Sequence, residues 1–479
     1  MAAGFSTPPF TFIPTLPSME TVSTAVFSTA AGGTRFWWLF SLVLVLLLVV
    51  AAAAFLLPQP WSWLVGVTYV AYESWLTGRL FASSRRAVLA AAQSAAIGEA
   101  PALAVLIAAR NERSGMPATL AELARQVRAG DEVLVVDDGS TDDTLAWLQQ
   151  TYALEWKGDL GRSPSHPFLS VLRQVNRGKA RSLNTALPLT SAPVVMTIDA
   201  DTLPEAGALD AVRRSFSDPA VEVGCGVLHP LCQHGWSRWF FGIFQGLEYR
   251  RSYLWRMGWM RDRTLVLVSG AFAVFRRPLL EEVGGFDPLS KAEDYELLFR
   301  LHHAAAKRGH VLGAVVISDA RAITDAPGTV RQFLRQRTRW FAGFIETMVR
   351  HRGMVGNPQC GRLGTYHLLV KTVDLLLPLY GLLAVTLLVA YLITGGVIHA
   401  WILVLLLAKL AYDLGLHLWS MALHRRWQGT SGLTFGTFIA TLLEPIAFQP
   451  LRQLGAAYGW IAFLRRRIDW APQRPTGKS

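Results

Sequence analysis

The feature that most constrains this chain is an apolar segment near its start, which runs from Phe36 to Leu57 for 22 residues without a charged side chain. At about 1.5 Å per residue, a helix of this length crosses the hydrocarbon core of a bilayer, which is about 30 Å thick. A cleaved signal peptide is the alternative, but this segment is longer than the apolar region of such peptides. The residues before it carry only Glu20 and Arg35 as charges. The segment therefore predicts a membrane-spanning helix.

The composition is that of a membrane protein with a soluble portion. Hydrophobic residues make up 52% of the 479 residues and charged residues 17%, whereas a globular domain has about 25% charged residues. This balance excludes disordered, collagen-like and coiled-coil proteins. The net charge of +12 reflects basic residues at helix ends and not one basic stripe, so nucleic acid is not an expected partner. Cys225, Cys232 and Cys360 form no C-x-x-C, so neither a disulfide framework nor a zinc site is expected.

Further apolar segments predict more membrane helices. Trp61–Phe81 follows the first segment closely, so residues 35–82 are expected to form a transmembrane hairpin. Leu375–Thr394 and Ile398–Trp419 form a second pair. A last segment, Leu433–Leu464, contains prolines and fits either a broken hairpin or a re-entrant segment. Four or six membrane helices are therefore expected, depending on this last segment.

Arginines flank both hairpins on the side away from their uncharged turns, which predicts that these ends face the cytoplasm. We therefore expect a multi-pass protein of the cell inner (plasma) membrane whose central region is cytoplasmic. The predicted divisions are a flexible tail (1–34), a transmembrane hairpin (35–82), a cytoplasmic domain (97–328), interfacial amphipathic helices (329–366), C-terminal transmembrane helices (367–465) and a cytoplasmic tail (466–479).

The central region has the pattern of an α/β domain. Leu103–Ala108, Glu132–Val136 and Val194–Ile198 are short apolar runs of strand length, and a helical stretch over Ala118–Arg128 separates the first two. A polar cluster follows each run, which places three such clusters at the carboxyl ends of strands, where open parallel sheets bind ligands. Neither a G-x-G-x-x-G after a strand nor a G-x-x-x-x-G-K-[ST] is present, which disfavours a dinucleotide enzyme and a P-loop ATPase.

Each polar cluster has an ordinary structural explanation beside the functional one. Asp199 and Asp201, directly after the third run, would hold Mg²⁺ or Mn²⁺ bridging to a diphosphate, or would simply form a solvated turn. Asp137 and Asp138 begin an acidic cluster whose later residues would cap the next helix. Lys179 lies in a glycine-containing turn that suits either a phosphate or a plain surface loop.

The order of the motifs is more specific than any one of them. Read in series, they resemble the family 2 glycosyltransferases, in particular the membrane-embedded processive branch of cellulose, hyaluronan and poly-N-acetylglucosamine synthases. The resemblance covers roughly residues 100 to 345 and is carried by VLIAARNE (105–112), VVDDGSTDDT (135–144), NRGKARSLNTAL (176–187), TIDADT (197–202), VSGAFAVFRR (268–277), GGFDP with AEDYEL (284–297) and QRTRW (336–340).

The resemblance implies a GT-A fold inserted between transmembrane helices and a nucleotide-diphosphate sugar donor, usually UDP-linked. It implies that Asp294 is the general base of the reaction, beside Glu293, although an acidic pair at a helix N-terminus is the ordinary alternative. Ala292 stands where many members carry Thr. The other implied roles are nucleoside binding by Glu112, Asp137 and Asp138, contacts to nucleotide and diphosphate by Lys179 and Asp199, and metal ligation by Asp201 with Asp199.

The resemblance also assigns roles near the membrane. In the Q-x-x-R-W signature, Arg339 would stabilise the leaving diphosphate, and Gln336 and Trp340 would contact substrate, with the indole stacking on the acceptor sugar. An amphipathic interfacial helix over Thr329–Arg350 is the alternative, and both interpretations are compatible. Trp470 and Arg474 resemble the W-x-x-x-R gating segment of hyaluronan-type synthases. In the helix Ile398–Trp419, Lys409 and Asp413 would pair with each other or line a polymer channel.

These observations predict an inverting, processive transferase that polymerises a UDP-sugar into a β-linked polysaccharide and moves it across the membrane. The expected partners are the UDP-sugar, the growing polysaccharide or a lipid acceptor, and membrane lipid, with accessory subunits left open. The alternatives are a transferase that adds one sugar to a lipid, and a non-catalytic transporter or scaffold with a transferase-like domain. The sequence does not specify the sugar.

Overall fold

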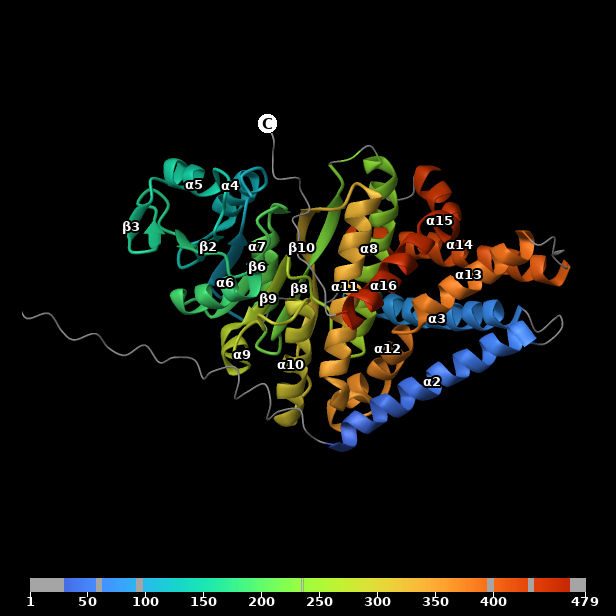
Figure 1. Ribbon diagram of the computed structural model, residues 1–479. Helices are drawn as coiled ribbons and strands as arrows, with labels where there is room; N and C mark the ends of the chain where they lie inside the picture. Colours follow the sequence, from blue (N-terminus) through green and yellow to red (C-terminus); the bar gives the residue numbers. More distant parts are fainter. Residues whose placement is uncertain are drawn as a thin grey trace, which may run out of the picture.

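The computed structural model describes residues 30–56, 63–91, 98–233, 235, 237–393, 400–429 and 435–465. Most of the predicted N-terminal tail, together with Trp470 and Arg474, lies outside the described residues. Figure 1 shows a sheet domain on one side of the molecule and long helices extending from the other side.

The domain is built on one ten-stranded sheet in the order β3-β4-β5-β2-β1-β6-β9-β8-β10-β7. The pairs β1–β2, β1–β6, β2–β5 and β8–β10 are parallel, and the remaining pairs are antiparallel. The strands are β1 (Leu103–Ala109), β2 (Glu132–Asp138), β3 (Glu155–Lys157), β4 (Leu160–Arg162), β5 (Leu169–Gln174), β6 (Val194–Ile198), β7 (Thr202–Pro204), β8 (Val223–Leu231), β9 (Phe272–Arg276) and β10 (Ala314–Asp325).

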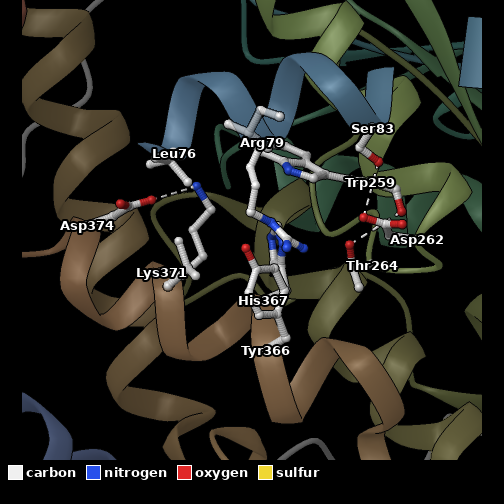
Figure 2. Close-up of a pocket in the computed structure, with 12 residues that line it drawn as sticks. Leu76, Arg79, Ser83, Trp259, Asp262, Thr264, Tyr366, His367, Lys371 and Asp374 are labelled. Carbon is white, nitrogen blue, oxygen red and sulfur yellow. Dashed lines mark hydrogen bonds and ion pairs between the residues drawn. The ribbon is translucent and has the colours of Figure 1, made fainter. Parts of the chain in front are cut away.

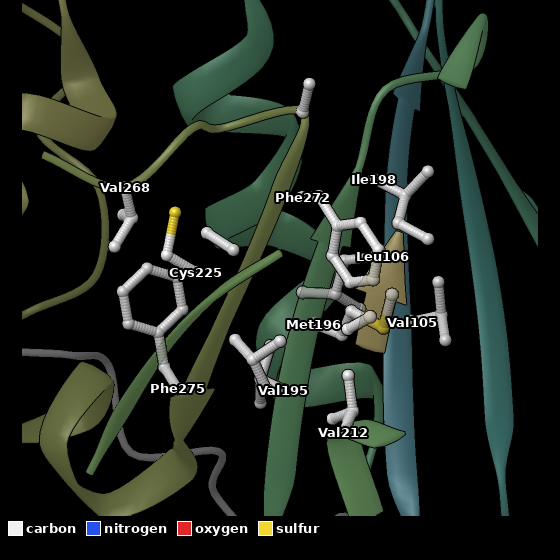
Figure 3. Close-up of a cluster of buried hydrophobic side chains, with 14 of the residues drawn as sticks. Val105, Leu106, Val195, Met196, Ile198, Val212, Cys225, Val268, Phe272 and Phe275 are labelled. Atoms are coloured by element: carbon white, nitrogen blue, oxygen red, sulfur yellow. The ribbon is translucent and has the colours of Figure 1, made fainter. Parts of the chain in front are cut away.

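The three predicted strands are the buried centre of this sheet. β1, β2 and β6 pair in parallel, with Ala109 opposite Asp137 at the end of β1, so their polar termini meet at one edge. The side chains of these strands pack with those of β9 into one core, in which Val105, Met196 and Phe272 lie together (Figure 3). A near-continuous apolar run is typical of a strand covered on both faces.

Helices connect and cover the strands. The sheet domain contains α4 (Met116–Gln126), α5 (Thr144–Tyr152), α6 (Lys179–Ala186), α7 (Ala208–Phe216), α8 (Arg238–Arg261), α9 (Arg277–Glu282) and α10 (Glu293–Lys307). The predicted helix over Ala118–Arg128 is α4, displaced by two residues toward the N-terminus. This arrangement is a GT-A-like mixed sheet with flanking helices, as the resemblance implies.

The remaining helices form the part of the molecule beside α8. They are α2 (Ala30–Leu56), α3 (Leu64–Ala91), α11 (Val330–Arg350), α12 (Leu368–Asp374), α13 (Leu377–Ile393), α14 (Ala400–Gln428), α15 (Phe435–Ala447) and α16 (Gln449–Leu464). The predicted interfacial helix is α11, which is capped by Thr329. α15 and α16 correspond to the broken apolar segment near the C-terminus.

Within the described residues, three helical stretches are long and apolar enough to cross a membrane: Gly33–Ala54, Leu363–Ile393 and Ile402–Gln428. α2 begins at Ala30, inside the predicted tail. α3, the second helix of the predicted hairpin, extends ten residues beyond its expected end at Phe81 and is too polar to count among the three. The number of spans and their orientation stay predictions.

Candidate active site

The polar loops after β1 and β2 form one unit. Asn111, with φ of 59°, accepts a hydrogen bond on Oδ1 from the Thr141 amide at 2.7 Å, and its own amide donates to Ser140 Oγ at 3.0 Å. The Glu112 amide donates to Thr144 Oγ1 at 3.1 Å. Two of the predicted strand-end clusters are therefore joined, and Glu112 lies beside the loop that follows Asp137.

Asp137 and Asp138 end β2 and are both buried, but their surroundings differ. Asp138 accepts hydrogen bonds from the Arg177 amide on Oδ1 and the Gly178 amide on Oδ2, both at 2.8 Å. Asp137 has one oxygen without a hydrogen-bond partner among the described residues, and burial raises the pKa of its carboxyl. Asp138 thus holds the loop that leads to Lys179, while Asp137 keeps a free acceptor.

Lys179 brings the third strand end into the same site. Gly178, at φ 88°, starts α6 so that Lys179 Nζ lies 2.5 Å from Asp199 Oδ1 and 3.8 Å from Glu293 Oε1. Burial alone would lower the pKa of Lys179, but attraction to Asp199 and Glu293 outweighs it and the pKa is raised. Lys179 therefore remains a cation beside the end of the third predicted strand.

The acidic pair Glu293 and Asp294 begins α10 and faces this lysine. Asp294 Oδ2 accepts a hydrogen bond from the Gly270 amide at 2.7 Å, and Lys179 Nζ donates to the Gly270 carbonyl at 3.3 Å. Burial raises the pKa of Glu293, and attraction to Lys179 and Arg339 opposes that effect. The carboxylates lie at a helix N-terminus and also beside Lys179, so their position is compatible with both interpretations of the pair.

The Q-x-x-R-W residues lie on α11. Arg339 lies close enough to Glu293 that its positive charge lowers the pKa of the Glu293 carboxyl, against the effect of burial. Gln336 is buried, and its Oε1 has no hydrogen-bond partner among the residues described. The Trp340 side chain is 37% exposed, and the Arg337 guanidinium lies 4.5 Å from the centre of its ring. The structure thus places Arg339 with the strand-end cluster and leaves an indole face accessible nearby on the same helix.

The residues Asp199 and Asp201 fit a divalent cation shared with a substrate phosphate. The described part of the chain contains no group of three His, Cys, Asp or Glu side chains placed to hold a metal ion. Mg²⁺ is commonly bound by one or two carboxylates, with phosphate oxygens and water completing its coordination. A turn closed by the Thr202 amide on the Asp199 carbonyl at 3.0 Å sets the two aspartates at the end of β6.

Two residues of the site carry no predicted role. Gly270 and Asn111 both occur in motifs of the series. Gly270 contributes its backbone amide, which donates a hydrogen bond to Asp294, and Asn111 adopts a left-handed φ. The sequence feature that could have indicated Gly270 is its position between Ser269 and Ala271 in the fifth motif. Together the residues can bind an anion through Lys179 and Arg339 and accept a proton through Asp294.

Comparisons with known proteins bear on the family and the fold. A family model described as "Glycosyl transferase family group 2" matches residues 194–424. The poly-beta-1,6-N-acetyl-D-glucosamine synthases of Staphylococcus aureus (strain COL) and Staphylococcus epidermidis are each 26% identical to this chain, over 53% and 52% of its length. The matches cover only 57% and 56% of those relatives.

A solved structure has the same fold. The mannosyltransferase PcManGT from Pyrobaculum calidifontis, in complex with GDP-Man and Mn²⁺, matches with a TM-score of 0.52 and 19% identity over 85% of this chain and 99% of that chain. This likeness supports the fold assignment and, at such low identity, nothing further.

Proposed function

We propose that this chain, whose residues 194–424 match the family model described as "Glycosyl transferase family group 2", is a processive, inverting glycosyltransferase that polymerises a UDP-sugar into a β-linked polysaccharide. The observation that carries the proposal is the meeting of Lys179, Asp199, Glu293 and Asp294 at one edge of the sheet, beside α11. The relatives named as polysaccharide synthases support the same reaction class.

In the proposed mechanism, Asp294 takes the proton from the acceptor hydroxyl as its oxygen attacks the anomeric carbon. The bond to Gly270 fixes this carboxylate but leaves lone pairs for the proton, since each oxygen accepts two hydrogen bonds. Lys179 and Arg339 stabilise the charge that develops on the leaving diphosphate. A cation held by Asp199 and Asp201 would supply further charge neutralisation at that diphosphate.

Trp340 supports the polymer-synthesising form of this proposal. Its exposed indole offers a flat surface on which the terminal sugar of an acceptor can stack. The adjoining apolar helices offer a route for the product into the membrane. The second candidate, transfer of one sugar to a membrane lipid, uses the same catalytic residues and is favoured by the same position of α11 between domain and membrane helices.

The test uses purified full-length protein in lipid with Mg²⁺ or Mn²⁺ and a panel of radiolabelled UDP-sugars. GDP-mannose is added because the solved relative is a GDP-Man complex. We expect high-molecular-weight product from one donor in the wild type and none from Asp294→Asn. Asp319→Asn is the matched control because its side chain is 71% exposed, and it should retain full activity.

The size of the product separates the candidates. A labelled monosaccharide confined to the lipid fraction would contradict processive polymerisation and establish single transfer. Equal activity of Asp294→Asn and wild type would overturn the assignment of the base. An absence of turnover with every donor, even with membrane extract as acceptor source, would contradict the proposed reaction.

A further inference from the structure

A cavity with a basic lining lies between α3, the C-terminal end of α8 and α12 (Figure 2). Its volume is about 40 Å³, which is room for roughly three water-sized groups at about 10–15 Å³ each. Arg79 and Lys371 project into it from opposite sides. None of the residues assigned above to the transferase site lines it, so its role does not follow from the proposed reaction.

Arg79 is the cation of this cavity that has no counter-ion. Its guanidinium lies 4.6 Å from the centre of the Tyr366 ring, and it makes no hydrogen bond or ion pair with any residue in the described ranges. Lys371 lies 5.0 Å from the centre of the Trp259 ring and pairs with Asp374 at 3.0 Å. Arg79 is therefore available to an external anion.

The carboxylates of the cavity are already engaged. Asp374 pairs with Lys371 and also accepts a hydrogen bond from the Tyr72 hydroxyl at 3.2 Å. Asp262 accepts a hydrogen bond from Ser83 Oγ at 3.1 Å and lies 3.4 Å from a nitrogen of Arg362. Arg261 is a further partner of Asp262 at 3.8 Å. The cations thus outnumber the carboxylates at this place.

Two buried nitrogens at the cavity have no protein partner. Trp259 Nε1 and His367 Nε2 belong to side chains that are 8% and 5% exposed, and neither makes a hydrogen bond with the described residues. A buried N–H without an acceptor costs about 1–3 kcal/mol, so a ligand that supplies acceptor oxygens would be favoured. Tyr366 and His367 come from a single π-helical turn, Leu363–His367, and such turns are frequent at functional sites.

From these observations we propose that the basic cavity binds a phosphate group, carried by a phospholipid headgroup or present as free phosphate. Arg79 supplies the paired charge. Trp259 supplies an N–H donor, and His367 supplies a second donor when its neutral ring carries the proton on Nε2. Leu76, Leu80 and Val370 line the same cavity and suit the apolar part of a lipid. Lys371 precedes the apolar helix α13 in one of the stretches long enough to cross a membrane. Basic pockets beside membrane helices are known to bind anionic lipid headgroups, and one wall of this cavity belongs to such a candidate helix.

The test measures binding, so its failure is separate from failure of the proposed reaction. The purified full chain in a neutral detergent is titrated with dihexanoyl phosphatidic acid, with inorganic phosphate and with dihexanoylglycerol, and its unfolding temperature is recorded. We expect a saturable rise with phosphatidic acid, with inorganic phosphate or with both, and none with dihexanoylglycerol. A response to the lipid alone identifies a headgroup, and an equal response to inorganic phosphate identifies free phosphate.

Three variants localise the effect. Arg79→Gln should weaken the apparent affinity at least tenfold, and Trp259→Phe, which keeps an aromatic ring but removes the five-membered ring with its N–H, should weaken it several-fold. Arg85→Gln is the matched control, since Arg85 is exposed on the same helix and does not line the cavity, and it should bind as the wild type does. If Arg79→Gln does not fold, Lys371→Gln replaces it.

The proposal is overturned if no phosphate ligand gives a saturable response, or if the pocket variants bind as tightly as Arg85→Gln. An equal response to dihexanoylglycerol would show that only the acyl chains bind. A neutral N-acetylglucosamine oligomer is the last arm of the titration. Saturable stabilisation by the oligomer, lost in Arg79→Gln, would show that the cavity receives sugar and not phosphate.

Discussion

Gly270 lies at the point where the strand-end cluster and α10 meet. A Cβ atom at this position would lie 3.2 Å from Asp294 Oδ2 and 3.3 Å from Lys179 Nζ. Both distances are tight enough that the Asp294 carboxylate or the lysine would have to shift by a few tenths of an ångström. Gly270 is therefore important because its lack of a side chain leaves room for Asp294 and Lys179. A search for charged residues alone does not find such a position.

We predict that Gly270→Ala lowers kcat by about 10-fold to 100-fold, because small displacements of reacting groups cost up to about that factor. The measurement is the steady-state rate with the donor identified by the panel above, together with the unfolding temperature. Gly415→Ala is the control, because a Cβ there meets nothing within 4 Å. Wild-type kcat in Gly270→Ala would show that Asp294 and Lys179 need no such close fit.

The sequence predicted the charged residues of the site better than their individual tasks. Lys179, Asp199, Glu293 and Asp294 are brought together as their motif order implied. Asp138, expected to hold the nucleoside, also accepts hydrogen bonds from two backbone amides of the next loop. These hydrogen bonds depend on where the loop turns in space, and the residue type alone does not indicate them. The nucleoside role of Asp138 stays a prediction.

At the scale of elements, two glycines of α16 allow this helix to pack closely against α11. A Cβ on Gly455 would lie 2.5 Å from Arg337 Cβ, and a Cβ on Gly459 would lie 2.9 Å from Phe341 Cβ. The spacing of four residues puts both glycines on one face of α16, and such a pair lets helix backbones approach closely in membranes. This contact holds the helix of the Q-x-x-R-W residues against the C-terminal helices.

We predict that Gly455→Val lowers the unfolding temperature and the activity together, because the added methyl groups force α16 away from α11. Overpacking of this kind costs about 1–3 kcal/mol. Thermal unfolding in detergent and the rate of product formation are the measurements. Gly415→Val, which adds the same side chain where no atom is close, should have a smaller effect. Equal effects of the two variants would contradict the packing argument.

A second link between elements is ionic. Glu248 on α8 accepts a hydrogen bond from Arg337 of α11 at 2.6 Å and lies 3.6 Å from a nitrogen of Arg452 on α16. The side chains of Glu248 and Arg337 are only 15% and 13% exposed. Arg337 in turn stacks on Trp340, so one carboxylate supports the position of the predicted acceptor-binding indole.

We predict that Glu248→Gln destabilises the protein by about 1.5–3 kcal/mol, the range for hydrogen bonds to charged groups. It should also raise KM for the acceptor more than it lowers kcat. The control is Glu282→Gln, whose partner Arg308 is 39% exposed, and such exposed pairs contribute about 0–1 kcal/mol. The measurements are the acceptor KM and the unfolding temperature of both variants. An unchanged acceptor KM in Glu248→Gln would show that the ion pair of Glu248 with Arg337 has no role in acceptor binding.

Elements with a strong local pattern were predicted accurately. β6 has the predicted bounds, and α11 begins one residue after the predicted start at Thr329, which serves as its cap. The strands β7 to β10 were not anticipated, because they pair with partners far away in the sequence. α3 was expected to end at Phe81, but its polar second half continues because it packs against α8. Tertiary contact determines that boundary.

For the whole molecule, the helices α3 and α14 share a core with the sheet domain. Phe81, Ala87 and Val88 of α3 and Leu423 of α14 are buried in the same cluster as the strands β1, β2 and β6. At the C-terminal end of α14, Trp427 Nε1 donates a hydrogen bond to Ser318 Oγ at 2.7 Å. These two helices are therefore part of the folded sheet domain as well as of the helical part of the molecule.

We predict that a fragment of residues 98–351, which lacks α3 and α14, aggregates or unfolds at least about 10 °C below the full chain. Each buried aliphatic or aromatic side chain that loses its partners forfeits up to about 1.5–3 kcal/mol, and 1 kcal/mol shifts the unfolding temperature of such a domain by about 2–4 °C. Size-exclusion chromatography and thermal unfolding are the measurements. Residues 63–351, which restore α3, should recover part of the loss because Phe81, Ala87 and Val88 return to the core. A soluble, monomeric fragment 98–351 that unfolds with the full chain would show that the sheet domain folds without α3 and α14.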